Sequence, residues 1–348
     1  VVANNLNKII DVNYYPTDKT QRSNFLHRPV GIGIQGLADV FAMMDLPFCS
    51  DESKEVNKLI FETIYHASLE KSNELAIERC ETMMALKKCK DNNVELFVNS
   101  DKMCREYTEV GKKQPNINVV KPIRAELENS GTTMGSYSSF VGSPTSYGIL
   151  QFDMWSVKPS NMYDWDTLKS SIKMYGLRNS LSLAPMPTAS TSQILGNNEC
   201  FEPFTSNIYS RRTMAGDYVL VNKHLMRELT DLELWDEKLK NNIILNKGSI
   251  QHINGIPDKI KEKYKIVWEI PMKELIDMAA DRGAFICQSQ SMNLWIEEPD
   301  YKKLTSMHFY SWKKGLKTGI YYLRRKPRHQ SQQFTIEPEK STGNDNEN

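Results

Sequence analysis

The sequence predicts an α/β fold with largely parallel strands, and three observations carry this prediction. Short apolar runs, such as those at 217–222, 283–296 and 320–324, alternate with longer segments whose apolar residues recur at helical spacing. This alternation is typical of parallel strands joined by helices. Glycine and proline separate the segments, and no internal repeat is visible.

The N-terminal third predicts three helices. Residues 1–11 place apolar side chains on one stripe, and a second helix follows the glycines at 31–36 and ends before Pro47. The third helix is long and runs from about residue 50 to 80. Ser50 and Ser53 are its candidate N-caps, because acidic residues crowd the turn that follows them.

The composition and periodicity of the chain change at about Cys80. Residues 80–138 are charged and weakly periodic, which favours a surface insertion with some structure of its own, too short to bury much core. We therefore expect a first segment at 1–79, a second at 139–326, and a polar, disordered tail at 327–348.

The sequence of the second segment predicts further helices and a loop. The stretch 202–212 is expected to be a loop. The last helix is predicted with Thr305 as its cap and Gly319 as its end. The remaining predicted helices lie at 164–176, 190–196, 223–230, 258–266 and 272–282.

Composition excludes several classes of protein. The formal net charge of +1 creates no field that would attract nucleic acid or an anionic membrane. No apolar run approaches the ~18 residues of a membrane span, and no signal peptide is seen. The six cysteines are scattered, without metal-ligand spacing, which indicates a reducing compartment. We therefore expect a cytoplasmic protein without nucleic-acid or membrane partners and without a metal site.

Gly31, Gly33 and Gly36 spell G-x-G-x-x-G before a helix. A dinucleotide site would need a full strand before this motif and an acidic residue at the end of the next strand. Here a proline interrupts the preceding run, and the later acidic residues begin a helix. We interpret the glycines as a turn at which a helix packs close to another backbone.

The stretch "APMPTASTSQILG", residues 184–196, places small hydroxyl residues at the start of a helix. Free backbone N–H groups and the positive end of the helix dipole make such a turn suitable for a phosphate or diphosphate. The same pattern fits an ordinary Ser/Thr helix cap. The pattern alone leaves both interpretations open.

Tyr321 and Tyr322 stand side by side directly after "KTGI". Neighbouring side chains in a strand point to opposite faces, so the pair fits a strand covered on both sides. The alternative is a pair kept together for the chemistry of phenols.

Seven blocks of sequence resemble one protein family. They include "NLNKIIDVNYYP", "HRPVGIGIQGLAD", "RNSLSLAPMPTASTSQILGNNE", "EPFTSNIYSRR" and "TSMHFYSWKKGLKTGIYYLR". In this order they resemble the large catalytic subunit of class I ribonucleotide reductase of the eukaryotic and viral type, over nearly the whole chain except the insertion and the tail. The resemblance implies the C-terminal half of the family's ten-stranded α/β barrel, to which 1–79 and 139–326 would both belong.

The resemblance also implies a reaction and its residues. Ribonucleoside diphosphates would lose the 2′-hydroxyl by radical chemistry begun by a cysteine thiyl. Tyr321 and Tyr322 match the family's radical-relay tyrosines. The segment Pro187, Thr188, Ala189, Ser190 and Thr191 matches its substrate diphosphate loop. A groove for the C-terminal peptide of the small subunit is expected along the helix at 305–318.

Other parts of the family's machinery are expected elsewhere. The resemblance implies that the Asn-x-Cys-x-Glu constellation, the substrate-reducing cysteines and the sites for ATP and dNTP effectors lie upstream of Val1, since nothing in this sequence spells the constellation. The metal-radical cofactor would belong to the small subunit, and the family implies a homodimer.

The tail lacks the cysteine pair that accepts electrons from thioredoxin or glutaredoxin. Cys200 and Cys287 are interpreted as small packing residues. We therefore expect a reductase that is incomplete and inactive alone. The alternative is a degenerate subunit that binds nucleotide or a partner.

Overall fold

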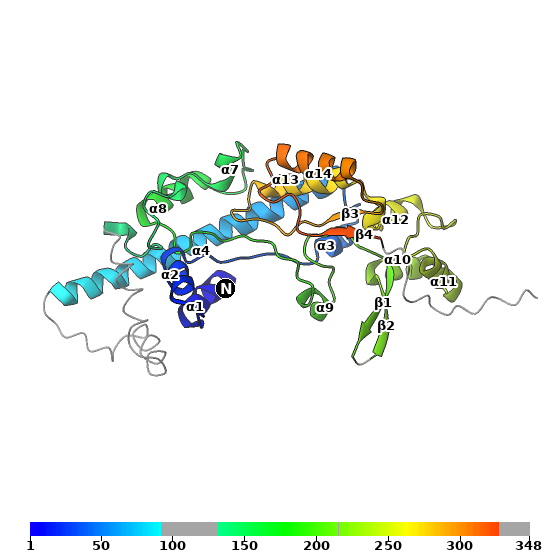
Figure 1. Ribbon diagram of the computed structural model, residues 1–348, viewed down its shortest axis with the longest axis horizontal. Helices are drawn as coiled ribbons and strands as arrows, with labels where there is room; N and C mark the ends of the chain where they lie inside the picture. The colour runs from blue at the N-terminus through cyan, green and yellow to red at the C-terminus, as the bar shows by residue number, and fades with distance from the viewer. Residues whose placement is uncertain (92–130, 215, 327–348) are drawn as a thin grey trace, which may run out of the picture.

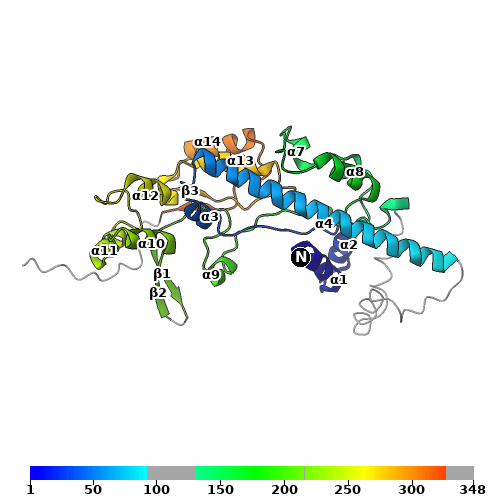
Figure 2. The ribbon, with the colours of Figure 1, turned by 180° about the vertical axis from the view of Figure 1, so that it is seen from behind.

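The computed structural model describes residues 1–91, 131–214 and 216–326, and all structural statements below concern these residues. The predicted tail and residues 92–130 of the predicted insertion lie outside them. The described chain is elongated, and the long helix α4 (Asp51–Asp91) runs obliquely through it (Figures 1 and 2). Helices α13 (Met272–Gly283) and α14 (Tyr301–Lys313) lie on one side of α4, whereas α1 (Val2–Val12), α2 (Asp18–His27), α9 (Thr191–Leu195) and a β-hairpin lie on the other (Figure 1).

Most predicted helices are present. The sequence analysis did not predict α2, α7 and α11, which are short or have weak apolar stripes. The helices besides α4 are α1 (Val2–Val12), α2 (Asp18–His27), α3 (Leu37–Met43), α7 (Gln151–Met154), α8 (Trp165–Tyr175), α9 (Thr191–Leu195), α10 (Lys223–Asp231), α11 (Glu237–Leu245), α12 (Asp258–Lys263), α13 (Met272–Gly283) and α14 (Tyr301–Lys313), with 3₁₀ turns at η1 (Gly131–Thr133), η2 (Pro144–Tyr147) and η3 (Val267–Glu269).

Helix α4 organises the core. Ser50 caps it as expected, since its hydroxyl accepts the backbone N–H of Ser53 at 3.1 Å. Phe61 and Tyr65 of α4 pack in a buried cluster with Phe152 and Phe285, so α4 joins the two predicted barrel segments. The predicted boundary at residue 80 falls inside α4, which continues to Asp91. No helix in the described ranges, α4 included, combines the length and apolarity needed to cross a membrane.

Four extended segments lie side by side and lead to the candidate site. An isolated parallel bridge joins Ile32 to Leu183. Gln288 donates its backbone N–H to Leu183 at 3.1 Å, which adds segment 287–293 to the row. Strand β3 (Leu294–Ile296) then pairs in parallel with β4 (Leu323–Arg325). This row forms part of a wall, and it does not close into a barrel within the described residues.

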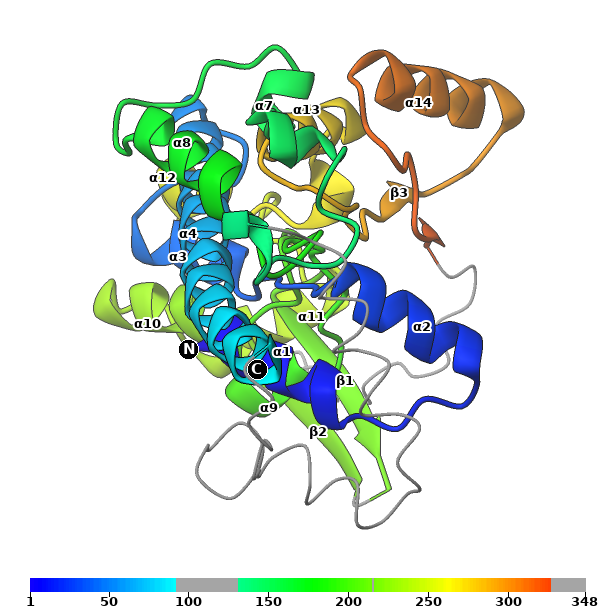
Figure 3. The same cartoon turned by 90° about the vertical axis from the view of Figure 1, so that its left-hand side faces the viewer.

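The expected parallel arrangement does not extend to the other sheet. Strands β1 (Ile208–Thr213) and β2 (Gly216–Val221) form an antiparallel hairpin that projects from the body (Figures 1 and 3). The prediction of a loop at 202–212 was therefore wrong over β1. "IYSRRT" and "GDYVLV" are two β-prone runs separated by a short turn, and this hairpin signal was overlooked.

The predicted ends of the last helix were also wrong. Asp300 caps α14, because its carboxylate accepts the backbone N–H of Lys303 at 2.7 Å, and Thr305 lies inside the helix. The helix ends before Gly315, whose φ of +81° suits glycine, and Gly319 lies beyond it. A carboxylate at the start of the helix is an equally good cap, and it lies one turn earlier.

Candidate functional site

The loop at 187–191 begins where the extended segment 181–185 ends. Two glycines of the 31–36 turn lie against the chain just before the loop. A Cβ on Gly33 would come within 3.0 Å of the Cα of Pro185, and one on Gly31 within 3.3 Å of the Cβ of Ala184. The glycines therefore allow close approach of two backbones, as expected, but the two backbones are extended segments, whereas the sequence interpretation expected a helix to pack there.

Thr188 anchors the loop. Its φ of +54° is unusual for a β-branched residue, and three contacts hold it there. Its hydroxyl accepts the backbone N–H of Cys200 at 2.8 Å, while its carbonyl accepts the N–H and hydroxyl of Ser192 at 3.0 and 2.6 Å. The hydroxyl of Thr188 is thus used for structure.

The outer part of the loop is open. Ala189, Ser190 and Thr191 are exposed, and Ser190 caps α9 without a side-chain hydrogen bond to the helix. The backbone N–H groups of 189–191 donate to no carbonyl among the described residues. Exposed hydroxyls and unpaired N–H groups together can hold an anion such as a phosphate.

The tyrosine pair lies level with the start of the loop in the row of extended segments. Ser291 donates its N–H to Pro185 at 3.0 Å, and Tyr321 donates its N–H to Met292 at 2.6 Å. The pair precedes β4, and Tyr322 is tied to β3, since its carbonyl accepts the N–H of Leu294 at 2.9 Å. The loop therefore ends one extended segment and the tyrosines begin a nearby one, on either side of residues 291–292, although they come from distant parts of the sequence.

The two phenol rings are in contact. Their centroids lie 4.4 Å apart with an angle of 61° between the planes, and each side chain is about half exposed. The hydrogen bond with Tyr322 raises the pKa of Tyr321, against the opposing effect of Arg324. A phenol that stays protonated must lose its electron and its proton together when it is oxidised.

Arg324 was missed by the sequence reasoning. Its guanidinium carbon lies 4.8 Å from the ring centroid of Tyr322 and 6.0 Å from that of Trp295. The available signal was its spacing, since residues two apart in an extended strand share a face. A cation over the ring disfavours loss of an electron from Tyr322 and so tunes its oxidation.

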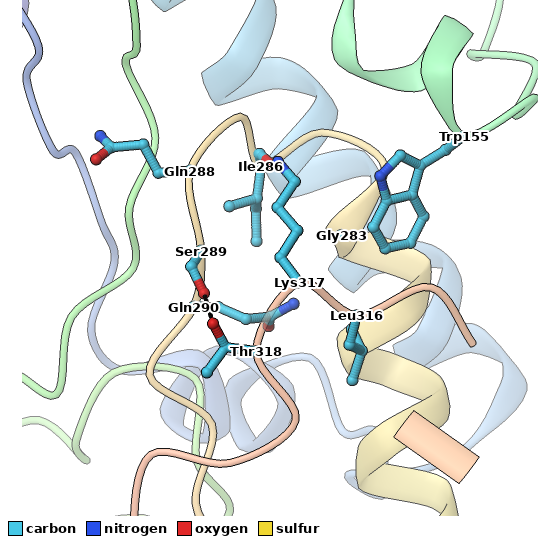
Figure 4. A pocket seen from close by; sticks show the side chains of 9 residues that line it. All are labelled: Trp155, Gly283, Ile286, Gln288, Ser289, Gln290, Leu316, Lys317 and Thr318. Atoms are coloured by element: carbon cyan, nitrogen blue, oxygen red, sulfur yellow. Dashed lines mark hydrogen bonds between the residues drawn. The ribbon is translucent and has the colours of Figure 1, made fainter. Parts of the chain in front are cut away.

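The segment before the tyrosines is fixed at a small surface hollow (Figure 4). The ammonium of Lys317 donates to the side chain of Gln151 and to the carbonyls of Ile286 and Cys287 at 3.0, 3.0 and 2.6 Å. Ser289 donates to the hydroxyl of Thr318 at 2.6 Å (Figure 4). Burial lowers the pKa of Lys317. These contacts hold the approach to the pair in one conformation.

A larger groove of about 850 Å³ lies between β3 and the first half of α14. Its lining combines apolar side chains, such as Trp295 and Met307, with charged ones, such as Lys302 and Asp300. Neither this groove nor the hollow at Lys317 is lined by the loop or by the tyrosine pair.

Two of the cysteines are thiols of low reactivity. Burial raises the pKa of both Cys49 and Cys200 to about 12, so both remain thiols at neutral pH. The sulfur of Cys287 accepts the backbone N–H groups of Ser182 and Leu183 at 3.0 and 3.2 Å. Among the described residues, no three potential ligands gather as a metal-binding group.

Comparison with known proteins shows which protein family this fold matches. The family model described as "Ribonucleotide reductase, barrel domain" matches residues 1–322. Ribonucleoside-diphosphate reductase large subunits are similar: that of Caenorhabditis elegans is 50% identical over 337 residues, covering 97% of this chain and 36% of that protein. The Dictyostelium discoideum protein is 52% identical, with coverage of 97% and 33%, and the Variola virus protein is 49% identical, with coverage of 98% and 37%.

The chain thus spans about a third of the length of these relatives. One similar solved structure is the Actinobacillus ureae class Id ribonucleotide reductase alpha subunit, with a TM-score of 0.59. It is 22% identical, and the match covers 93% of this chain and 44% of that one. This likeness concerns the fold.

Proposed function

The chain belongs to the ribonucleotide reductase family, as part of its barrel domain, and from this premise we propose that it is the C-terminal portion of a large subunit that reduces ribonucleoside diphosphates. In this proposal the loop Pro187–Thr191 binds the substrate diphosphate. Tyr321 and Tyr322 carry the radical to a hydrogen-abstracting cysteine supplied by another part of the large subunit. Contact between the two phenols, level with the loop on one wall, is the observation that carries the proposal.

Each group has a defined role. Ser190, Thr191 and the free N–H groups of 189–191 would bind phosphate oxygens, while Thr188 holds the loop in shape. Tyr322 would pass an electron to an oxidised Tyr321, or the reverse, with the phenolic proton moving along the hydrogen bond between them. The short ring separation favours this transfer.

The partners follow from the same proposal. A small subunit would hold the metal-radical cofactor that generates the oxidising equivalent, and its C-terminal peptide would dock in the groove between β3 and α14. ATP and dNTP effectors would bind the N-terminal part of the large subunit. Thioredoxin or glutaredoxin would supply electrons, the large subunit would be a homodimer, and the complex would work in the cytoplasm.

The relay is tested with Tyr321→Phe and Tyr322→Phe in the complete large subunit, assayed with the small subunit. Phenylalanine keeps the ring but cannot lose a phenolic proton, so turnover should fall at least about 100-fold while diphosphate binding stays unchanged. Ala189→Asp in the loop should weaken diphosphate binding and so raise KM, because a carboxylate repels the phosphates. Wild-type turnover in either tyrosine variant would end the proposal.

A second test concerns completeness. Purified residues 1–348 with small subunit, reductant and a nucleoside diphosphate should give no deoxynucleotide. Formation of product would show that the hydrogen-abstracting group lies within this chain.

A further inference from the structure

A buried carboxylate lies between the loop and the tyrosine pair. Glu202 follows the loop's anchoring point at Cys200 by two residues and is 5% exposed. One carboxylate oxygen accepts the backbone N–H of Asn293 at 3.3 Å, and the other accepts the indole N–H of Trp295 at 2.9 Å. The side chain therefore fixes two points of the segment that leads into and forms β3.

That segment holds Tyr322 from both sides. The side-chain oxygen of Asn293 accepts the backbone N–H of Tyr322 at 3.2 Å, and the carbonyl of Tyr322 accepts the N–H of Leu294 at 2.9 Å. Trp295 shares the Arg324 guanidinium with Tyr322. A shift of Asn293 or Trp295 would therefore move the phenol or its cation.

The other end of the connection is the diphosphate loop. Thr188 accepts the N–H of Cys200, and the side chain of Asn198 donates to the carbonyl of Glu202 at 2.6 Å. Residues 198–202 thus form one hydrogen-bonded turn between loop and carboxylate. Within the described residues, the loop and Tyr322 share no direct hydrogen bond. Backbone hydrogen bonds of Ser291 to Pro185 and of Tyr321 to Met292 link their segments, and the contacts of Glu202 add a second, side-chain connection.

The surroundings supply a balancing charge. The guanidinium carbon of buried Arg282 lies 4.1 Å from the ring centroid of Phe201, the residue before Glu202. Arg282 also donates to Gln290 at 2.6 Å and to Asn57 of α4 at 3.2 Å. Burial raises the pKa of Glu202, and the attraction of Arg282 opposes that rise.

We propose that Glu202 is a positioning residue that couples the diphosphate loop to Tyr322 through Asn293 and Trp295. The inference rests on the proposed function, since it gives the two ends of the connection their roles. Within the described residues, the carboxylate of Glu202 hydrogen-bonds to Asn293 and Trp295 and to neither phenol oxygen. It acts by fixing the position of the loop relative to Tyr322.

The test is Glu202→Gln in the complete large subunit with its small subunit. Glutamine has the same shape, but its amide nitrogen must face a donor that the carboxylate accepted. We expect kcat to fall about 10- to 100-fold, the range for a lost buried charged hydrogen bond. Glu237→Gln is the matched control and should keep wild-type kcat, because Glu237 is exposed on α11 and, within the described part of the chain, its salt bridge is to Lys240.

A double-mutant cycle separates coupling from simple loss of structure. Thr188→Val removes the acceptor for Cys200, and Asn293→Ala removes the acceptor for Tyr322. In the presence of Glu202 their effects on kcat/KM should differ from the product of the single effects by more than threefold. In the Glu202→Gln background they should multiply within about a factor of two, as for independent sites.

A trapped radical gives a second readout. An easily oxidised analogue, 3-aminotyrosine, at position 322 should give a radical EPR signal that falls about tenfold in Glu202→Gln while substrate binding persists. If Glu202→Gln does not assemble, Glu202→Asp, which keeps the charge but cannot reach both donors, replaces it in the cycle.

The outcomes distinguish the two proposals. Wild-type turnover in Tyr322→Phe would remove the proposed function. An inactive Tyr322→Phe, together with an additive cycle and a full radical signal in Glu202→Gln, would overturn the role of Glu202 alone.

Discussion

Thr188→Val isolates the hydroxyl that anchors the loop at 187–191. Valine has the same branched shape, so the unfavourable backbone at φ +54° is kept and only the acceptor for the Cys200 N–H is lost. Cys200 is 1% exposed, so water cannot replace the lost hydroxyl. A buried donor without a partner costs about 1–3 kcal/mol, which favours opening of the loop by about 5- to 150-fold.

Hydrogen–deuterium exchange of amides within 184–200 measures this opening directly. We expect exchange to accelerate in Thr188→Val by that factor, and KM for a ribonucleoside diphosphate to rise, because the open loop must be reordered on binding. Thr188→Ser keeps the hydroxyl and is the control; its exchange should stay within about threefold of wild type. Equal exchange in wild type and Thr188→Val would refute the anchoring role.

Three further predictions concern groups around the site. Cys49 and Cys200, with pKa values of about 12, should be alkylated at pH 8 roughly 1,000-fold more slowly than a free thiol of pKa ~8.5. Labelling is measured by mass spectrometry, and unfolding in urea should abolish the difference. Fast labelling of the folded protein would contradict the burial of these thiols. Gly135→Ala should destabilise the protein by about 3 kcal/mol or more, seen as a lower Tm, because the new Cβ would lie 1.9 Å from the backbone oxygen of Ala76 in α4. An unchanged Tm would show that the turn at Gly135 and α4 are not so closely packed. Burial would raise the pKa of Asp277, but hydrogen bonds from Lys273, Lys314 and Tyr310 outweigh it and hold the value at about 2. Because this pKa lies below the unfolded value of ~3.9, the stabilisation is present above pH ~4 and is lost as the pH falls towards 2. Asp277→Asn should therefore loosen α14 at pH 7 by about 1 kcal/mol after solvent screening, and exchange of the α14 amides at pH 7 and at pH ~2 should show this difference shrink in acid.

Local chemistry in the sequence was enough to predict several elements. Ser50 was recognised as the cap of α4, and Gly176, with φ of +80°, ends α8 as predicted. Both signals lie within one turn of the helix they terminate, so no distant contact is needed to interpret them. The same reasoning failed at Thr305, because Asp300 offered an equally suitable cap one turn earlier.

The candidate site was predicted less completely. The composition of 187–191 indicated an anion-binding turn, but it could not show that the hydroxyl of Thr188 is used by Cys200. Arg324 could have been placed beside Tyr322 from its spacing in the strand. Nothing in the sequence around Glu202 indicates that its partners lie about ninety residues later, at Asn293 and Trp295.

The sequence by itself determined the family, the helix termini set by local caps, and the chemical types of the loop and of the tyrosine pair. These follow from side chains and spacings within a few residues. Only the tertiary structure decided that 181–185, 287–296 and 321–325 are neighbours, and that buried Glu202 joins loop and phenol. The physical reason is that hydrogen bonds between extended segments, and the burial of a charge with its partners, depend on packing between residues far apart in the chain.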